Sequence, residues 1–127
     1  MKVHHIGILV KNIEKSINIY EKLGYIRATD IVIDRIQNNR IVFIESLDMT
    51  QWIELIEPID TESSVYNFKK GYHHICYDVS DMPDFFSYFK SLQIGKLFTK
   101  LIQAPAIDNR CVVFGCLNNG MFVEFLL

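Results

Sequence analysis

Apolar and polar residues alternate along residues 3–10, where valine and isoleucine predominate. Strict alternation of this kind predicts a half-buried strand. It places His5, Gly7 and Leu9 on one face, and it predicts that the neighbouring residue His4 points to the opposite side.

A helix is predicted next, because Ile13, Ile17 and Tyr20 recur at the spacing of one helical face. Asn12 can cap its start by accepting an unpaired backbone N–H, and Gly24 suits the left-handed position after its end. The pattern then predicts three strands, near residues 26–34, 39–46 and 51–57. The first part of the chain therefore reads β-α-β-β-β.

The same order of elements is predicted again after residues 58–71, a segment with a linker-like composition and a possible short helix at its end. The second series comprises a strand over 72–79, a helix over 82–92 with Asp81 as cap and Pro83 in the first turn, and strands near 96–104, 109–116 and 120–126. Residues 1–57 and 72–127 are thus predicted to be two modules of one α+β domain, because a module of about 60 residues is marginal alone.

The two modules also repeat particular residues. The pair His4-His5 recurs 69 residues later as His73-His74, and a shift of 70 residues aligns Glu54 with Glu124. The second histidine and the glutamate are separated by 49 residues in the first module and by 50 in the second. Glu57 has no acidic counterpart in the second module and is interpreted as a surface residue.

Composition narrows the class of protein. Of the 127 residues, 50% are apolar and 22% are charged, which is typical of a globular chain, and the net charge of −2 offers no basic surface to nucleic acid or anionic lipid. We find no signal peptide and no apolar run of about 18 residues. Three cysteines, an odd number, favour reduced thiols. We therefore expect a cytoplasmic protein with a small-molecule substrate, no nucleic acid and no membrane.

The repeated histidines and glutamates suggest a metal site. If a pseudo-twofold axis relates the modules, their sheets can curve around a common cleft that receives equivalent residues from both. A lone buried histidine is more often structural and a lone glutamate more often faces solvent, but two matched pairs at nearly equal spacing favour a shared site. Two imidazole nitrogens and two carboxylate oxygens suit Zn, Ni, Co, Mn or Fe(II).

Four segments carry a resemblance to a known family: the opening His-His-Ile-Gly-Ile-Leu-Val-Lys-Asn-Ile, Ile53-Glu54-Leu55-Ile56-Glu57-Pro58, Gly71-Tyr72-His73-His74-Ile75 and Val123-Glu124-Phe125. Together they resemble the vicinal oxygen chelate (glyoxalase/bleomycin resistance) superfamily over essentially the whole chain. Within it they are most similar to the methylmalonyl-CoA epimerase and glyoxalase I branches.

The resemblance implies paired β-α-β-β-β modules in a curved mixed sheet, usually as a homodimer. It implies one divalent metal ion per chain, with Zn, Ni, Co and Mn as candidates, held by His5, Glu54, His74 and Glu124. The family ligand directly precedes an Ile/Val-Gly/Ala pair, which selects these histidines over His4 and His73. The latter two are interpreted as strand-entry residues at the rim.

The activity implied is that of a lyase or isomerase which abstracts a proton next to a carbonyl of a small thioester or 2-oxo compound. Glu124 is the expected base, and Glu54 is the second catalytic candidate. Two alternatives stay open: an Fe(II)-dependent dioxygenase of the same superfamily, and a non-catalytic protein that binds an antibiotic or another small molecule.

Asn109 and Arg110 are candidates for substrate binding, because a guanidinium beside a polar turn can hold a carboxylate or phosphate. The alternative is a plain turn, in which Asp108 and Asn109 bond to their own backbone.

Overall fold

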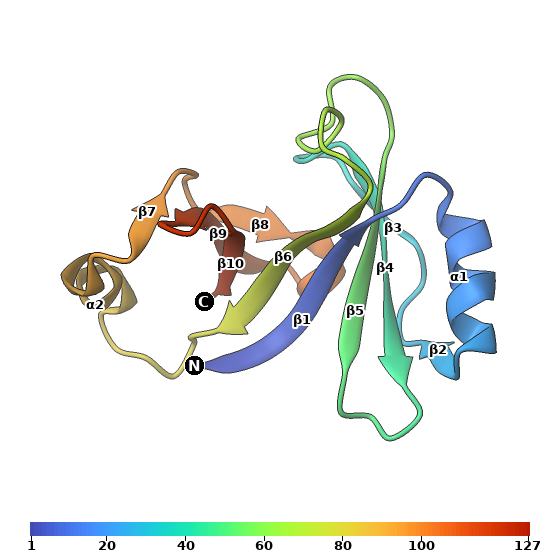
Figure 1. The fold of residues 1–127 in the computed structure, drawn as a ribbon, viewed down its shortest axis with the longest axis horizontal. Coiled ribbons are helices and arrows are strands. Elements are labelled where there is room, and N and C mark those ends of the chain that lie inside the picture. The colour runs from blue at the N-terminus through green and yellow to red at the C-terminus, as the bar shows by residue number, and fades with distance from the viewer.

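A computed structural model describes residues 1–127 and shows one curved sheet of ten strands with two helices (Figure 1). The first unit consists of β1 (Lys2–Leu9), α1 (Ile13–Lys22), β2 (Tyr25–Arg27), β3 (Val32–Asp34), β4 (Asn39–Ser46) and β5 (Trp52–Pro58). The second consists of β6 (Gly71–Asp78), α2 (Phe85–Leu92), β7 (Gly95–Leu97), β8 (Ile102–Ala104), a short 3-10 turn (Pro105–Ile107), β9 (Arg110–Leu117) and β10 (Phe122–Leu126).

The strand order is β2-β4-β5-β1-β6-β10-β9-β7, with β3 paired to β4 and β8 paired to β9. The first strands of the two units, β1 and β6, run antiparallel at the centre. Each also pairs in parallel with the last strand of its own unit, β1 with β5 and β6 with β10. Counted from either edge, equivalent strands of the two units follow in the same order. The predicted α+β class of two repeated units on a curved mixed sheet is confirmed.

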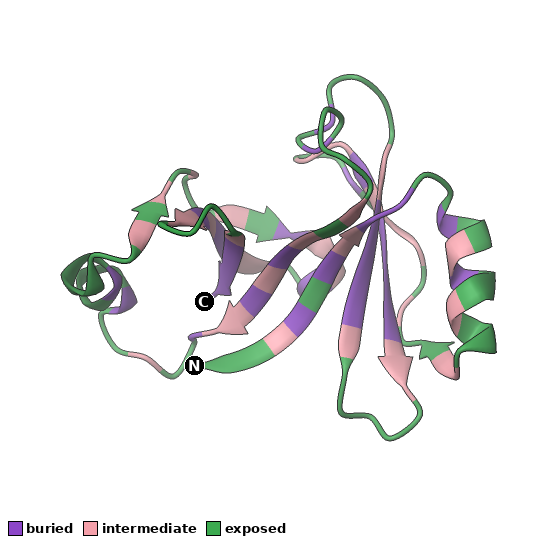
Figure 2. Cartoon of the chain, in the orientation of Figure 1, coloured by how far each residue is buried: buried purple, intermediate pink, exposed green.

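Successive residues of a strand belong to different core clusters on the two faces of the sheet, and the buried residues are coloured purple in Figure 2. On β4, Ile41 and Phe43 belong to the cluster on the inner face of the sheet, whereas Val42 and Ile44 pack with residues of α1. On α2, Phe85 and Phe89 cover the corresponding outer face of the second unit. The two helices lie at opposite ends of the molecule (Figure 1), so the inner face at the centre is left to the connections and the site.

Both predicted long strands, over 26–34 and 96–104, are divided in two. At each break a threonine hydroxyl takes the place of a ladder partner: Thr29 Oγ1 accepts the N–H of Phe43 at 3.0 Å, and Thr99 Oγ1 accepts that of Phe114 at 2.9 Å. A side chain that competes with the backbone in this way interrupts the ladder.

The first helix follows the prediction, and the second departs from it. Asn12 accepts the backbone N–H of Lys15 at 2.9 Å, and Gly24 has a φ of +96°. The second helix begins at Phe85 rather than near residue 82, because Asp84 has a φ of +51°. Asp81 and Pro83 therefore belong to the turn before α2.

The predicted linker over 58–71 is shorter in the structure, because Pro58 ends β5 and Gly71 begins β6; residues 59–70 contain turns and no helix. No helix of the chain is long and apolar enough to cross a membrane.

Candidate metal centre

The four predicted ligands stand on four adjacent strands, β5, β1, β6 and β10. In the strand register, Gly7 of β1 stands between Glu54 of β5 and His74 of β6, which gives one row across the sheet. In the equivalent row, Cys76 of β6 stands between His5 of β1 and Glu124 of β10. Each short row therefore brings a glutamate and a histidine from different units to the same inner face.

The donor atoms of the four side chains converge on one small space. His5 Nε2 lies 3.3 Å from Glu54 Oε2 and 3.2 Å from Glu124 Oε2, and His74 Nε2 lies 3.6 and 3.4 Å from the same oxygens. The two Nε2 atoms are 3.3 Å apart. Four atoms bound to one ion at about 2.1 Å would be separated by roughly 3.0 to 3.4 Å.

The burial of these groups also fits a cation. The exposed fractions are 1% for His5 and His74, 6% for Glu54 and 4% for Glu124. Glu124 Oε2 is buried, and no donor meets it in hydrogen-bond geometry. A buried carboxylate oxygen without a donor is costly unless a positive charge compensates it, so the donor set fits a divalent metal of the Zn, Ni, Co or Mn kind.

The electrostatics without an ion show how closely these groups interact. Burial alone would lower the pKa of His5, but the Glu54 and Glu124 carboxylates raise it to about 9. Burial alone would raise the pKa of Glu124, but the two imidazoles outweigh it and hold this pKa well below the usual range. In the metal-free protein the positive charge of protonated His5 therefore compensates part of the negative charge of the two carboxylates, as a metal cation would.

The side chains of His4 and His73 do not point away from the neighbouring ligands, as simple strand alternation predicted. Both are the extra residues of β-bulges: the β1–β6 register passes from Val3 directly to His5, and the partners of Gly7 and Ile8 skip His73. A bulge re-aims the side chain that it carries.

Each bulge histidine consequently lies beside the neighbouring ligand instead of on the opposite face. His4 Nδ1 lies 2.8 Å from His5 Nδ1, and His73 Nδ1 lies 2.9 Å from His74 Nδ1. Burial lowers the pKa of His4 and, together with His74, lowers that of His73 to about 4. A neutral imidazole can accept the Nδ1 proton of its neighbour and thereby leave Nε2 free to bind metal.

Gly7 is required for the placement of His74. A Cβ atom at position 7 would lie 2.2 Å from His74 Cε1, because the imidazole covers the backbone at this point. Cys76, the residue at the matching place in the second unit, is fully buried. Burial, followed by the charge of Glu124, raises the pKa of its thiol, so the group stays protonated.

Asn109 and Arg110 are not brought to the centre. Arg110 lies 3.3 Å from both carboxylate oxygens of Asp78, and its Nε donates to the carbonyl oxygen of Leu127 at 3.4 Å. Asn109 has a φ of +57° and donates its backbone N–H to Ala104. Neither residue lines the spaces around the four donors.

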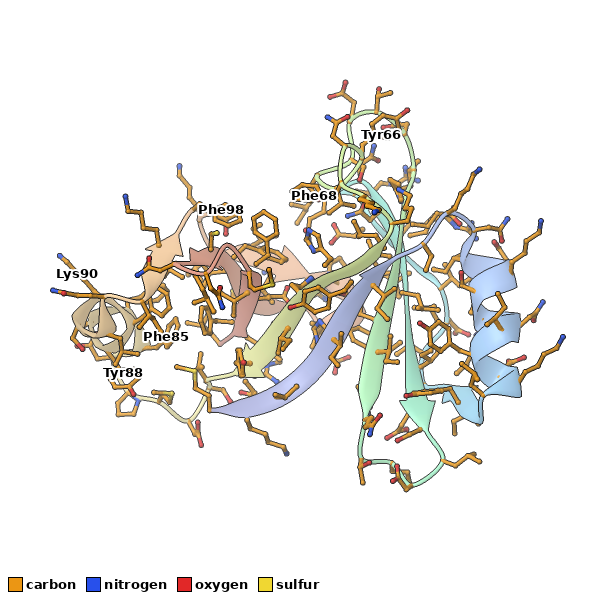
Figure 3. The ribbon with its side chains drawn as sticks, in the orientation of Figure 1. Tyr66, Phe68, Phe85, Tyr88, Lys90 and Phe98 are labelled. Atoms are coloured by element: carbon orange, nitrogen blue, oxygen red, sulfur yellow. The ribbon has the colours of Figure 1, made fainter.

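The sequence interpretation missed a cavity of about 190 Å³ beside the centre. It is lined mainly by aromatic and aliphatic side chains, Phe68 and Phe98 among them, and it shares Gln37, Val65, His73 and Phe114 with the smaller space around Glu54, His74 and Glu124. Phe68 belongs to the β5–β6 connection and Phe98 to the β7–β8 connection, and both lie on the same side of the molecule (Figure 3). The signal available in the sequence was Phe68, an aromatic residue within the linker-like segment 58–71.

Two β-α-β-β-β units on one curved sheet, with a buried His/Glu set contributed by both, define a protein of paired modules built around a shared polar centre. The sequence pattern of the Glyoxalase/Bleomycin resistance protein/Dioxygenase superfamily matches residues 4–100, and the chain belongs to that superfamily. The resemblance seen in the sequence is confirmed.

Relatives within the superfamily include proteins named as epimerases. The chain is 28% identical over 86 residues to the mitochondrial methylmalonyl-CoA epimerase of Dictyostelium discoideum, a match that covers 64% of this chain and 51% of the relative. It therefore spans only about half of that protein's length.

Solved structures share the whole fold. The methylmalonyl-CoA epimerase of Mycobacterium tuberculosis superposes with a TM-score of 0.83 at 21% identity, covering 98% of this chain and 86% of that one. A variant of the Streptomyces coelicolor methylmalonyl-CoA epimerase, in complex with 2-nitronate-propionyl-CoA, gives 0.79 at 15% identity, with coverage of 99% and 96%.

Proposed function

We propose that the chain is a metal-dependent isomerase or lyase that removes the proton next to a carbonyl group of a small thioester or 2-oxo compound. The observation that carries the proposal is the convergence of Nε2 of His5 and His74 with Oε2 of Glu54 and Glu124 in a buried space. The names of the relatives support an epimerase-type reaction.

His5, Glu54, His74 and Glu124 would hold the ion. A divalent ion in this place supplies a Lewis acid that stabilises the negative charge left on the substrate oxygen after the proton has gone. The chain supplies the proton acceptor and excludes water from it, because both carboxylates are buried.

Glu124 is the proposed base. Although burial opposes it, the imidazoles of His5 and His74 hold the pKa of Glu124 well below the usual range, so its carboxylate is ionised at neutral pH. It would leave the metal to accept the proton. The electron pair of the broken C–H bond stays on the substrate. In an epimerisation Glu54, the second catalytic candidate, would deliver a proton to the opposite face of the same carbon. In a glyoxalase-type isomerisation Glu124 would return its proton to the adjacent carbon.

Substitution of each carboxylate tests this assignment. Glu124→Gln is expected to retain most of the bound metal, since an amide oxygen can coordinate, and to lose about 10²-fold or more in proton exchange. Glu54→Gln, the matched variant of the other unit, should show the smaller kinetic loss. The measurement is bound metal together with exchange of substrate C–H for solvent deuterium in a single turnover; parent-rate exchange in Glu124→Gln with none in Glu54→Gln would reverse the roles.

The same exchange experiment distinguishes the reaction class. Proton transfer incorporates solvent deuterium without consuming oxygen, whereas a dioxygenase consumes oxygen in proportion to substrate. The donor set has two carboxylates, while the Fe(II) oxygenase site typically has two histidines and one carboxylate, which favours the isomerase. Stoichiometric oxygen uptake by the metal-loaded protein would favour the dioxygenase instead.

A homodimer and a cytoplasmic location remain part of the proposal. Sedimentation velocity of the purified protein tests the dimer, and fractionation of the source cells tests the location.

A further inference from the structure

The cavity beside the metal centre has an unusual chemical character for a site that would admit an acidic thioester. It is walled mainly by Ile36, Val65, Phe68, Phe98, Phe114 and Phe122, and no lysine, arginine, aspartate or glutamate lines it. A free carboxylate of the substrate that entered this cavity would find no cationic side chain in its wall, and the cost of its desolvation would be uncompensated.

The wall contains four uncharged polar side chains, and each has at least one partner; His73 Nδ1, for example, lies 2.9 Å from His74 Nδ1. Gln37 donates its side-chain amide to Asp34 at 3.1 Å, and Ser64 accepts a hydrogen bond from Asn39 at 3.3 Å. The Thr99 hydroxyl accepts the N–H of Phe114. Because most of the wall is apolar and none of its polar side chains is a lysine, arginine, aspartate or glutamate, dispersion and apolar burial dominate what it can bind.

The aromatic side chains form one connected wall that reaches the ligands. Phe68 and Phe98 contact Phe122, with ring centroids 5.2 and 5.9 Å apart, and Phe122 stacks on His73 at 5.5 Å. Phe114 packs edge-on against His74, one of the proposed ligands, at 5.5 Å. A group in this cavity is thus adjacent to whatever the centre binds.

The volume limits the size of that group. The cavity measures about 190 Å³, and a cavity of about 150 Å³ lined by similar side chains is known to hold benzene. Aromatic rings prefer edge-to-face or offset contact with other rings, which this wall can offer from several directions.

We propose that this cavity binds an uncharged aryl group attached to the reacting carbonyl compound, so that the substrate is an aryl-substituted 2-oxo compound or thioester and not a dicarboxylic one. This inference rests on the proposed function for the adjoining centre and names the substrate class that the centre serves. The wall comes from both units and from the β5–β6 connection, so the preference is a property of the whole chain.

Hydroxamates test the preference without catalysis, because they chelate a metal through two oxygens and can carry different arms. Binding of acetohydroxamate, benzohydroxamate and the monohydroxamate of malonic acid to the zinc-loaded protein is measured by calorimetry. The expected result is that benzohydroxamate binds about 10- to 100-fold more tightly than acetohydroxamate, and that the carboxylate arm gives no advantage. Equal binding of the first two, or tightest binding of the carboxylated arm, would overturn the proposal.

Two phenylalanines provide the matched variants. Phe98→Ala should lose most of the preference for benzohydroxamate and leave acetohydroxamate unchanged, since Phe98 touches the cavity and is itself largely exposed. Phe86→Ala removes an exposed ring from α2 and should change neither. A preference that survives in Phe98→Ala would place the aryl group elsewhere and contradict the assignment.

A metal-free measurement separates this inference from the proposed function. If the protein binds no zinc, the proposed centre fails, and the cavity is then probed with 4-fluorobenzyl alcohol by fluorine NMR. Binding that Phe98→Ala weakens and Phe86→Ala does not supports the aryl cavity on its own. Absence of binding, or equal binding by both variants, refutes it.

Discussion

Gly7 shows how a single missing side chain shapes the centre. The imidazole of His74 lies where a Cβ of residue 7 would stand, at 2.2 Å, so the substitution Gly7→Ala must displace the ring. We expect zinc affinity to fall about 10- to 100-fold, the range found when the surroundings of a metal ligand are disturbed. Competition with a chromogenic chelator measures the affinity.

The repeat supplies the control for this experiment. Cys76 holds the matching place beside His5, and Cys76→Ala removes an atom instead of adding one, so it should leave the position of the imidazole unchanged. Both variants are checked by circular dichroism for retained fold. Equal zinc affinity in Gly7→Ala and the parent would show that His74 can bind metal from another position.

A pH dependence follows from His5 in the metal-free protein. Its folded pKa of about 9 is above the value near 6.5 of an unfolded histidine, so its stabilising contribution is complete below pH 6.5 and is lost as the pH rises through 9. The shift corresponds to about 3 kcal/mol of unfolding free energy across this window. Urea unfolding in excess chelator, followed by Trp52 fluorescence, measures the decrease.

His5→Gln should remove this decrease, because glutamine does not titrate in this range. Zinc should remove it as well, since a histidine bound to metal is neutral. Constant or rising stability of the metal-free parent between pH 6.5 and 9 would contradict the ion pairing of His5 with the two glutamates.

At the scale of residues, the sequence identified the four converging side chains but not their surroundings. The repeat made them visible, because a matched His/Glu pair in each half does not depend on details of the backbone. The contacts of His4 and His73 depend on two bulges, and simple alternation of side chains along a strand cannot reveal an extra residue. The pairing of Arg110 with Asp78 was equally hidden, because it depends on where β9 begins, with Arg110 opposite Ala104.

At the scale of elements, α1 depends on a residue that the sequence suggested was merely on the surface. Glu57 Oε2 accepts the backbone N–H of Ile13, the first residue of the helix, at 2.6 Å, and Glu57 Oε1 pairs with Arg40 at 3.0 Å. The strand β5 therefore holds the start of α1 against the sheet. A carboxylate near a helix N-terminus is also favoured by the helix dipole.

We expect Glu57→Ala to reduce the unfolding free energy by about 1 to 2 kcal/mol, the usual effect of losing a helix cap. Glu62→Ala, at an exposed position in the β5–β6 connection, should change it by less than about 0.5 kcal/mol. Urea unfolding of both variants beside the parent measures the difference. Equal stability of all three would mean that Asn12 alone fixes the start of the helix.

Element order was predictable, and element ends were not. Periods of 2 and 3.6 residues identified strands and helices in the right sequence, since burial on one face imposes them. The breaks at Thr29 and Thr99 and the late start of α2 depend on local hydrogen bonds and on the left-handed Asp84, which leave little trace in the hydrophobic pattern.

At the scale of the molecule, the two units share both a sheet and a site. The antiparallel pairing of β1 with β6 joins them at the centre, and each unit contributes one histidine and one glutamate to the same space. Unfolding of either unit would therefore destroy the complete donor set. Metal binding to the folded chain alone should stabilise both units equally, by about 2.7 kcal/mol at a free zinc concentration one hundred times the Kd.

Two fluorescent reporters can test this coupling. Trp52, the only tryptophan, reports on the first unit, and the double variant Trp52→Phe/Phe86→Trp moves the reporter to the exposed face of α2 in the second. Each protein should unfold in one urea transition, and circular dichroism should show the same single transition as fluorescence. Zinc should raise the unfolding free energy by the same amount for both reporters. Adding His74→Ala should abolish the shift for both reporters, although the substitution lies in one unit only. A zinc shift confined to one reporter would show that the ion is held by a single unit, and the shared site would then be wrong.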